Sequence, residues 1–106
     1  MTDGFSFHPE AMAELVAGVD WYDERELALG ERFESSVRDA VQAALEAPDS
    51  WPVWSNWQAS PLVRSKMVGG FPYRVVYFVQ EHHLTVVAVA HAKRRPHYWI
   101  DRTDSR

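Results

Sequence analysis

The chain has 106 residues, an apolar content of 46% and a net charge of −4 at pH 7. This length predicts one domain over residues 1–106, and the apolar content is sufficient for one buried core. There is no cysteine, no signal-peptide pattern and no apolar run of membrane length, so the sequence excludes disulfides and thiolate metal sites, and we expect a cytoplasmic protein.

The first two elements are predicted to be a short strand and a helix. Residues 5–7 alternate apolar and polar side chains, which favours a strand added to a larger sheet. Pro9 suits the first position of a helix, and Glu10 suits the positive end of the helix dipole. Apolar residues then recur at helical spacing over residues 12–22.

A second helix is predicted after a short break, for which we expect Gly30 to be responsible. Apolar side chains recur every three or four residues over 33–45, until Pro48 ends the pattern. Two helices with so short a connection form an antiparallel hairpin. We expect the second helix to be the spine of the core, with Phe33 and Val41 on its buried stripe.

Residues 48–61, PDSWPVWSNWQASP, are rich in proline and tryptophan and have no periodicity. They predict an ordered loop. We expect its tryptophans, Trp51, Trp54 and Trp57, to pack against the domain rather than to stack on nucleobases.

The remaining residues predict three strands, at 62–68, 73–79 and 84–90, because they alternate or are rich in β-branched and aromatic residues. In the first of them Arg64 and Lys66 share one face, opposite Val63 and Met67. The fold class is therefore α+β, in the order β-α-α-β-β-β. An N-terminal strand and a helical hairpin precede a three-stranded antiparallel meander, with the helices on one face of the sheet.

The charges are divided between the two halves of the chain. Residues 1–60 hold twelve Asp and Glu against three Lys and Arg, whereas residues 61–106 hold eight Lys and Arg against three Asp and Glu. The helical layer is therefore predicted to be acidic, and the sheet and the segment after it basic. The segment HAKRRPHYWIDR at 91–102 concentrates the cations beside aromatic rings.

Several short stretches, taken in their order and spacing, carry a family resemblance. They are FHPEA at 7–11, DWYDE at 20–24, the step from Gly30 to Phe33, FPYRVVY at 71–77 and VAVAHAKRRPHYW at 87–99. From Phe5 to about Arg102 the chain resembles the RelE/ParE superfamily of bacterial toxins, which belong to type II toxin–antitoxin modules and include plasmid stabilisation proteins. The resemblance implies a toxin that an adjacently encoded antitoxin wraps and silences, with no cofactor and no metal.

The resemblance implies two possible activities. RelE-like members cut messenger RNA in the ribosomal decoding site, whereas ParE-like members poison DNA gyrase and have no known nuclease chemistry. Metal-free RNA cleavage needs a base for the 2′-hydroxyl, cations for the phosphorane and an acid for the leaving oxygen.

In a RelE-like toxin, cations of the sheet and a C-terminal tyrosine or histidine supply these groups. By resemblance, the paired cations of the family's second strand fall on Arg64 and Lys66, and the arginine of the third strand falls on Arg74. By the same resemblance, Ala92 stands where RelE carries an arginine at the end of the last strand, with Lys93 and Arg94 adjacent, and an alignment shifted by one residue places a cation there. The catalytic candidates for a nuclease are Arg74, Lys93, Arg94, His97 and Tyr98.

The basic side of the sheet is also the expected contact for an antitoxin or a target. The binding candidates are Arg64, Lys66, Arg74, Lys93, Arg94, Arg95, Tyr98 and Trp99. Structural roles are the alternative: Arg74 can pair with a carboxylate, and Tyr98 and Trp99 can cover the end of the sheet.

Charge favours a protein target. Proteins that dock on ribosomal RNA gain much of their affinity by neutralising phosphates. A chain with a pI of 5.7 presents its N-terminal carboxylates to that polyanion. Together with Ala92 at the strand end, this favours ParE-like action on gyrase. RelE-like cleavage of messenger RNA and a non-toxic, antitoxin-binding protein remain the alternatives.

Overall fold

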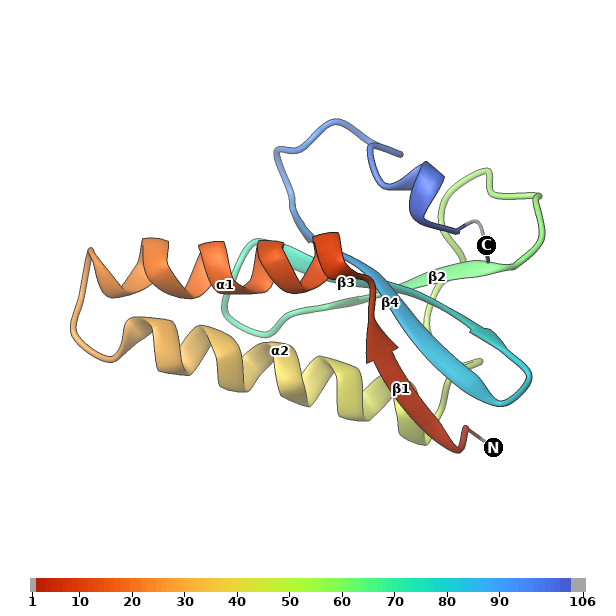
Figure 1. Cartoon of the computed structure of the whole chain (residues 1–106), viewed down its shortest axis with the longest axis horizontal. Coiled ribbons are helices and arrows are strands. Elements are labelled where there is room, and N and C mark those ends of the chain that lie inside the picture. Colours follow the sequence, from red (N-terminus) through yellow and green to blue (C-terminus); the bar gives the residue numbers. More distant parts are fainter. Residues whose placement is uncertain (1, 104–106) are drawn as a thin grey trace.

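A computed structural model describes residues 2–103. The elements are β1 (Gly4–Phe7), α1 (Pro9–Asp23), α2 (Leu29–Glu46), β2 (Val63–Met67), β3 (Tyr73–Gln80), β4 (His83–His91) and a short 3-10 helix, η1 (Ile100–Thr103). The predicted order β-α-α-β-β-β is confirmed, with both helices on one face of the sheet (Figure 1). Within the described part of the chain, no helix combines the length and the apolar character of a membrane span.

The sheet has four strands in the order β1-β4-β3-β2. The three strands β2, β3 and β4 form the predicted antiparallel meander, and β1 pairs with β4 in parallel, so the sheet is mixed. The pairing of β1 stops at the level of Phe7 and Val86, and α1 begins two residues later. Beyond that point the edge of β4 faces α1 instead of a strand.

The break between the helices differs from the expectation. The first helix ends at Asp23, and Ala28 (φ 66°) precedes α2, so Gly30 lies inside the first turn of α2. Its N–H donates to the Asp23 carboxylate (2.8 Å), and a Cβ at this position would lie 2.5 Å from the Val19 carbonyl oxygen. The prediction that Gly30 interrupts the helix is wrong: glycine is needed here because the two helices approach each other closely.

One core lies between the helices and the sheet. Phe33 is fully buried, and its ring centroid lies 4.7 Å from Tyr73, 5.1 Å from Tyr22 and 5.2 Å from Phe71. The buried stripe of α2 consists of Gly30, Phe33, Val37, Ala40, Val41 and Ala44. The prediction that the second helix is the spine of this core is confirmed.

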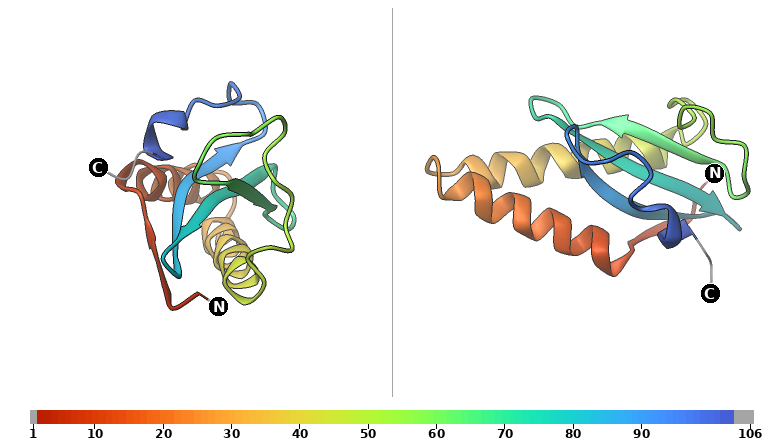
Figure 2. Two further views of the ribbon diagram at one scale, coloured as in Figure 1. Left: turned by 90° about the vertical axis from the view of Figure 1, so that its right-hand side faces the viewer. Right: turned by 90° about the horizontal axis from the view of Figure 1, so that it is seen from above.

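A second core covers the opposite face of the sheet. Trp99 is fully buried there among residues of β2, β3 and β4, and Trp54, Trp57 and Tyr98 pack against this cluster. Figure 2 shows the helices and the C-terminal segment on opposite sides of the strands. Trp51 packs instead against the first core, and its indole donates to the Ala43 carbonyl oxygen (3.1 Å). The prediction that the loop tryptophans pack against the domain is confirmed.

The buried Tyr77 makes the free energy of unfolding depend on pH in the alkaline range. Its hydroxyl donates to the Pro48 carbonyl oxygen (2.8 Å), and burial raises the pKa of Tyr77 to about 12. The unfolded chain loses the phenolic proton near pH 10. The contribution of Tyr77 is therefore fully present below about pH 10 and is lost as the pH rises through about 12.

We expect this loss to amount to about 2–3 kcal/mol, measured by urea unfolding between about pH 9 and pH 12. The variant Tyr77→Phe is the control and should lose less stability over the same pH range. An equal loss in the parent and the variant would contradict the assignment to Tyr77.

Candidate functional site

The C-terminal segment, residues 92–103, crosses the face of the sheet that the helices leave open (Figure 2). It leaves β4 with a hydrogen bond from the Ala92 N–H to the Pro72 carbonyl oxygen (2.8 Å). His97 adopts a positive φ of 67°, which turns the chain before Trp99 enters the second core. The predicted basic and aromatic segment is thus fixed to the sheet by its tryptophan.

An ion pair fastens the end of this segment to α1. Glu14 accepts from the Arg102 guanidinium at 3.0 Å and from the Val89 N–H at 2.9 Å, through different carboxylate oxygens. Arg102 also donates to the Val87 carbonyl oxygen (3.0 Å). The pair is only about one-seventh exposed, at 14% and 15%. The pair lies at the edge of β4, in the part beyond the end of the pairing with β1, where no strand of residues 2–103 is hydrogen-bonded to that edge.

Arg74 and His97 line one small cavity on the open face. The cavity has a volume of about 370 Å³, and its wall includes Trp54 and Ser65. Arg74 is exposed and donates to the Ser65 hydroxyl (3.2 Å). The Trp54 indole N–H donates to Nε2 of His97 (2.9 Å), so the proton of the neutral ring is assigned to Nδ1.

Arg64 and Lys66 lie on the other face of the sheet. In the register of β2 with β3 they stand opposite Tyr77 and Val75, whose side chains belong to the core beneath the helices. Arg64 donates to the Trp51 carbonyl oxygen (2.8 Å), and the Lys66 ammonium lies 4.7 Å from the centre of a Trp51 ring. The two cations share one face, as predicted, but the expectation that they form one basic surface with Arg74 is wrong.

The remaining candidates lie along the C-terminal segment. Lys93, Arg94 and Arg95 are all exposed. Trp99 is fully buried, so its predicted contact with a partner is replaced by a structural role in the second core. Sequence reasoning named both roles for this tryptophan, and the burial distinguishes them.

Tyr98 lies beneath two guanidinium groups. Arg94 is 3.9 Å and Arg102 is 5.1 Å from the centre of its ring. Its hydroxyl is buried and has no hydrogen-bond partner of acceptable geometry among the described residues. Burial, and after it the Glu14 carboxylate, raise the pKa of Tyr98 above that of an exposed tyrosine. A raised pKa makes this hydroxyl a weaker acid than an exposed tyrosine, and because it stays protonated at neutral pH it is not available as a base there.

The structure therefore brings together part of the predicted nuclease set. Arg74 and His97 share a cavity, whereas Tyr98 lies among Arg94, Arg102 and Glu14. In residues 2–103, no group of three His, Asp or Glu side chains is arranged as metal ligands.

Sequence reasoning did not identify Glu14 or Arg102 as important. Their ion pair joins positions 88 residues apart, so neither helical periodicity nor a local motif points to it. The only available signal was a carboxylate on the first helix and an arginine after the last strand, which many unrelated chains share.

Comparison with known proteins identifies the family. A family model described as the ParE toxin of the type II toxin–antitoxin system parDE matches residues 5–96. The comparison with curated proteins finds no significant match. A solved structure from the chromosomal ParDE toxin–antitoxin system of P. aeruginosa is similar, with a TM-score of 0.62 and 20% identity, over 88% of this chain and 98% of that chain. At this identity the solved structure supports the fold alone. Because the family model covers most of its length, the chain belongs to the ParE toxin family of type II toxin–antitoxin systems.

Proposed function

We propose that this protein is the growth-inhibiting toxin of its module, that it acts in the cytoplasm on DNA gyrase, and that an adjacently encoded antitoxin neutralises it. Membership of the ParE toxin family supports the role as a toxin and the existence of an antitoxin partner. Gyrase is the better-supported target, because the cations that a nuclease would need are separated in the fold.

The separation of these cations carries the proposal. Electrostatic catalysis requires donors that are already aimed at the developing charge. Arg64 and Lys66 lie on the helix-facing side of the sheet and Arg74 lies on the other, so the three cannot stabilise one phosphorane. Ala92 supplies no cation at the strand end. The site therefore supports binding to a protein better than cleavage of RNA.

The acidic helical layer supports the same choice. Residues 1–60 carry nine more carboxylates than cations, and most of them lie on α1, α2 and their connection. A ribosomal RNA surface would repel this layer, and a protein surface carries no such penalty.

One observation favours the second candidate, a ribosome-dependent messenger RNA endonuclease. Arg74 and His97 line the same exposed cavity, so a cation and a proton-transfer group are available there. Under this alternative His97, rather than Tyr98, would exchange the proton.

The two functions differ in what induction does to a cell. We expect growth arrest with filamentation and an SOS response, and we expect primer extension on a reporter message to find no new 5′ ends. Codon-spaced cuts in the message would replace gyrase by the ribosome as the target. Absence of any growth arrest from a folded, expressed protein would leave only antitoxin binding.

The variant Tyr98→Phe sharpens this test. Removing a buried hydroxyl that has no hydrogen-bond partner should cost little stability. We therefore expect Tyr98→Phe to fold and to arrest growth as the parent does, measured as colony counts after induction. Loss of toxicity in the folded variant would support proton transfer by Tyr98. A truncation after Ala92 is unsuitable, because it also removes the buried Trp99.

A further inference from the structure

We propose that the cleft between α1 and the end of β4 is a docking site for a segment of a partner protein that carries an apolar side chain next to a carboxylate. Naming the antitoxin as that partner rests on the proposed function. The cleft is separate from the cavity that holds Arg74 and His97.

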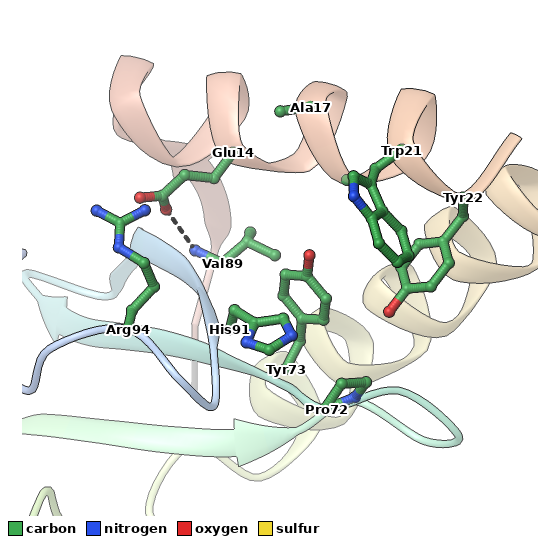
Figure 3. Close-up of a pocket in the computed structure, with 10 residues that line it drawn as sticks. Glu14, Ala17, Trp21, Tyr22, Pro72, Tyr73, Val89, His91 and Arg94 are labelled. Atoms are coloured by element: carbon green, nitrogen blue, oxygen red, sulfur yellow. Dashed lines mark hydrogen bonds between the residues drawn. The ribbon is translucent and has the colours of Figure 1, made fainter. Parts of the chain in front are cut away.

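The shape of the cleft is the first argument. It has a volume of about 500 Å³, enough for at least one large side chain, and it opens between α1 and the strands (Figure 3). Ala17 and Trp21 line it from α1, and Tyr73 and Val89 line it from the sheet. Apolar and aromatic walls of this kind accept an apolar anchor, because binding removes them from water.

The aromatic lip of the cleft is held in place before any partner binds. Trp21 remains 50% exposed although it is the largest type of side chain. The Arg25 guanidinium lies 3.4 Å from the centre of a ring of its indole, and the Tyr22 ring meets it edge-on at 5.0 Å and 85°. An exposed but ordered tryptophan loses little conformational freedom on binding, which is typical of residues that dominate an interface.

The charge of the cleft is the second argument. Both oxygens of the Glu14 carboxylate are already engaged, one by Val89 and one by Arg102. Arg94 lies at the same end of the cleft as Glu14 (Figure 3). Its guanidinium is stacked on Tyr98, 3.9 Å from the centre of the ring. It forms no ion pair with a carboxylate of residues 2–103. This guanidinium is free to receive a carboxylate from outside, and it sets the sign of the partner's charge.

These features together specify the partner. The aromatic wall at one end of the cleft fits an apolar side chain of the partner. The guanidinium at the other end, which has no ion pair with residues 2–103, fits a neighbouring Asp or Glu of the same segment. A nucleic acid fits poorly, because three carboxylates flank Trp21 along the chain: Asp20, Asp23 and Glu24. A second copy would bring two acidic helical layers together, which disfavours it.

The binding partner in the experiment is the protein encoded by the open reading frame next to this gene. Its binding to the full chain and to each variant is measured by calorimetry with the purified proteins. Ala17→Trp fills the cleft from an exposed position, and Arg94→Gln removes its cation. The matched controls are Ala13→Trp, which is exposed one helical turn earlier and does not line the cleft, and Arg38→Gln, an exposed arginine of α2 that does not line it either.

We expect Ala17→Trp and Arg94→Gln each to weaken binding by about tenfold or more, and each control to change it by less than about twofold. The Arg94→Gln complex should also depend less on salt than the parent complex. Thermal melts of the free variants establish that they are folded.

The outcomes separate the two proposals. If the neighbouring protein binds the parent and all four variants equally, the cleft is not the docking site, while the toxin–antitoxin function stands. If it does not bind the parent at all, the proposed antitoxin and the proposed docking both fail. A parent protein that dimerises in solution, and is made monomeric by Ala17→Trp, would show that a second copy occupies the cleft and would overturn the partner proposed here.

Discussion

Replacing Phe33 by alanine should lower the free energy of unfolding by about 3–5 kcal/mol. The ring is fully buried between α1, α2 and the sheet, and it contacts Tyr22, Tyr73 and Phe71. Gly18 of α1 packs directly against this ring, since a Cβ at Gly18 would lie 2.5 Å from it. Removing the ring therefore leaves a cavity beside a residue that has no side chain to fill it. Such a loss is a large share of the stability of a domain of this size.

Urea unfolding followed by circular dichroism measures the effect of Phe33→Ala. Leu27→Ala is the control, since Leu27 is 94% exposed in the connection between the helices, and it should change stability by less than about 0.5 kcal/mol. Equal midpoints for the two variants would show that the packing of α2 on the sheet is incorrect.

Breaking the ion pair between Glu14 and Arg102 is the second large effect. We expect Glu14→Gln to cost about 3 kcal/mol, because it leaves the Arg102 guanidinium largely buried without its counter-charge. Arg102→Met should cost a similar amount, since it leaves the Glu14 carboxylate and the Val87 carbonyl oxygen without their donor.

The double variant distinguishes a buried pair from two independent contacts. When both charges are removed together, neither remains buried alone, so the cost should be clearly smaller than the sum of the single costs. Arg38→Met is the control, since its ion pair with Glu34 (2.8 Å) is no longer than the pair of Glu14 with Arg102 (3.0 Å) but is exposed on α2, and it should cost less than about 1 kcal/mol. Strict additivity in the double variant would contradict the coupling.

The elements could be predicted from the sequence wherever a repeating pattern reflects burial. The apolar stripe from Phe33 to Ala44 recurs every three or four residues because one side of α2 faces the sheet. The role of Gly30 could not be predicted, because a glycine is needed there by the close approach of α1 and α2 and not by the end of a helix. A sequence pattern reports the helix propensity of a residue, but it does not report the distance between two helices.

The arrangement of the site was less predictable, for a related reason. Alternation correctly placed Arg64 and Lys66 on one face of their strand, but it does not say which face of the sheet that is. The register of β2 with β3 decides this, since it sets Lys66 opposite Val75 of the helix-facing core and Met67 opposite Arg74. A shift of one residue would have brought the cations to the face that Arg74 shares with His97.

The central claim is that this protein acts on gyrase and does not cleave RNA. It is tested most directly with purified gyrase. The refolded or antitoxin-released protein is added to gyrase and relaxed plasmid, and supercoiling and trapped DNA cleavage are measured beside a ribosome–message cleavage assay. We predict inhibited supercoiling or trapped cleavage with an uncut message, for both the parent and Tyr98→Phe. Codon-dependent cutting of the message by the parent, with gyrase unaffected, would contradict the account.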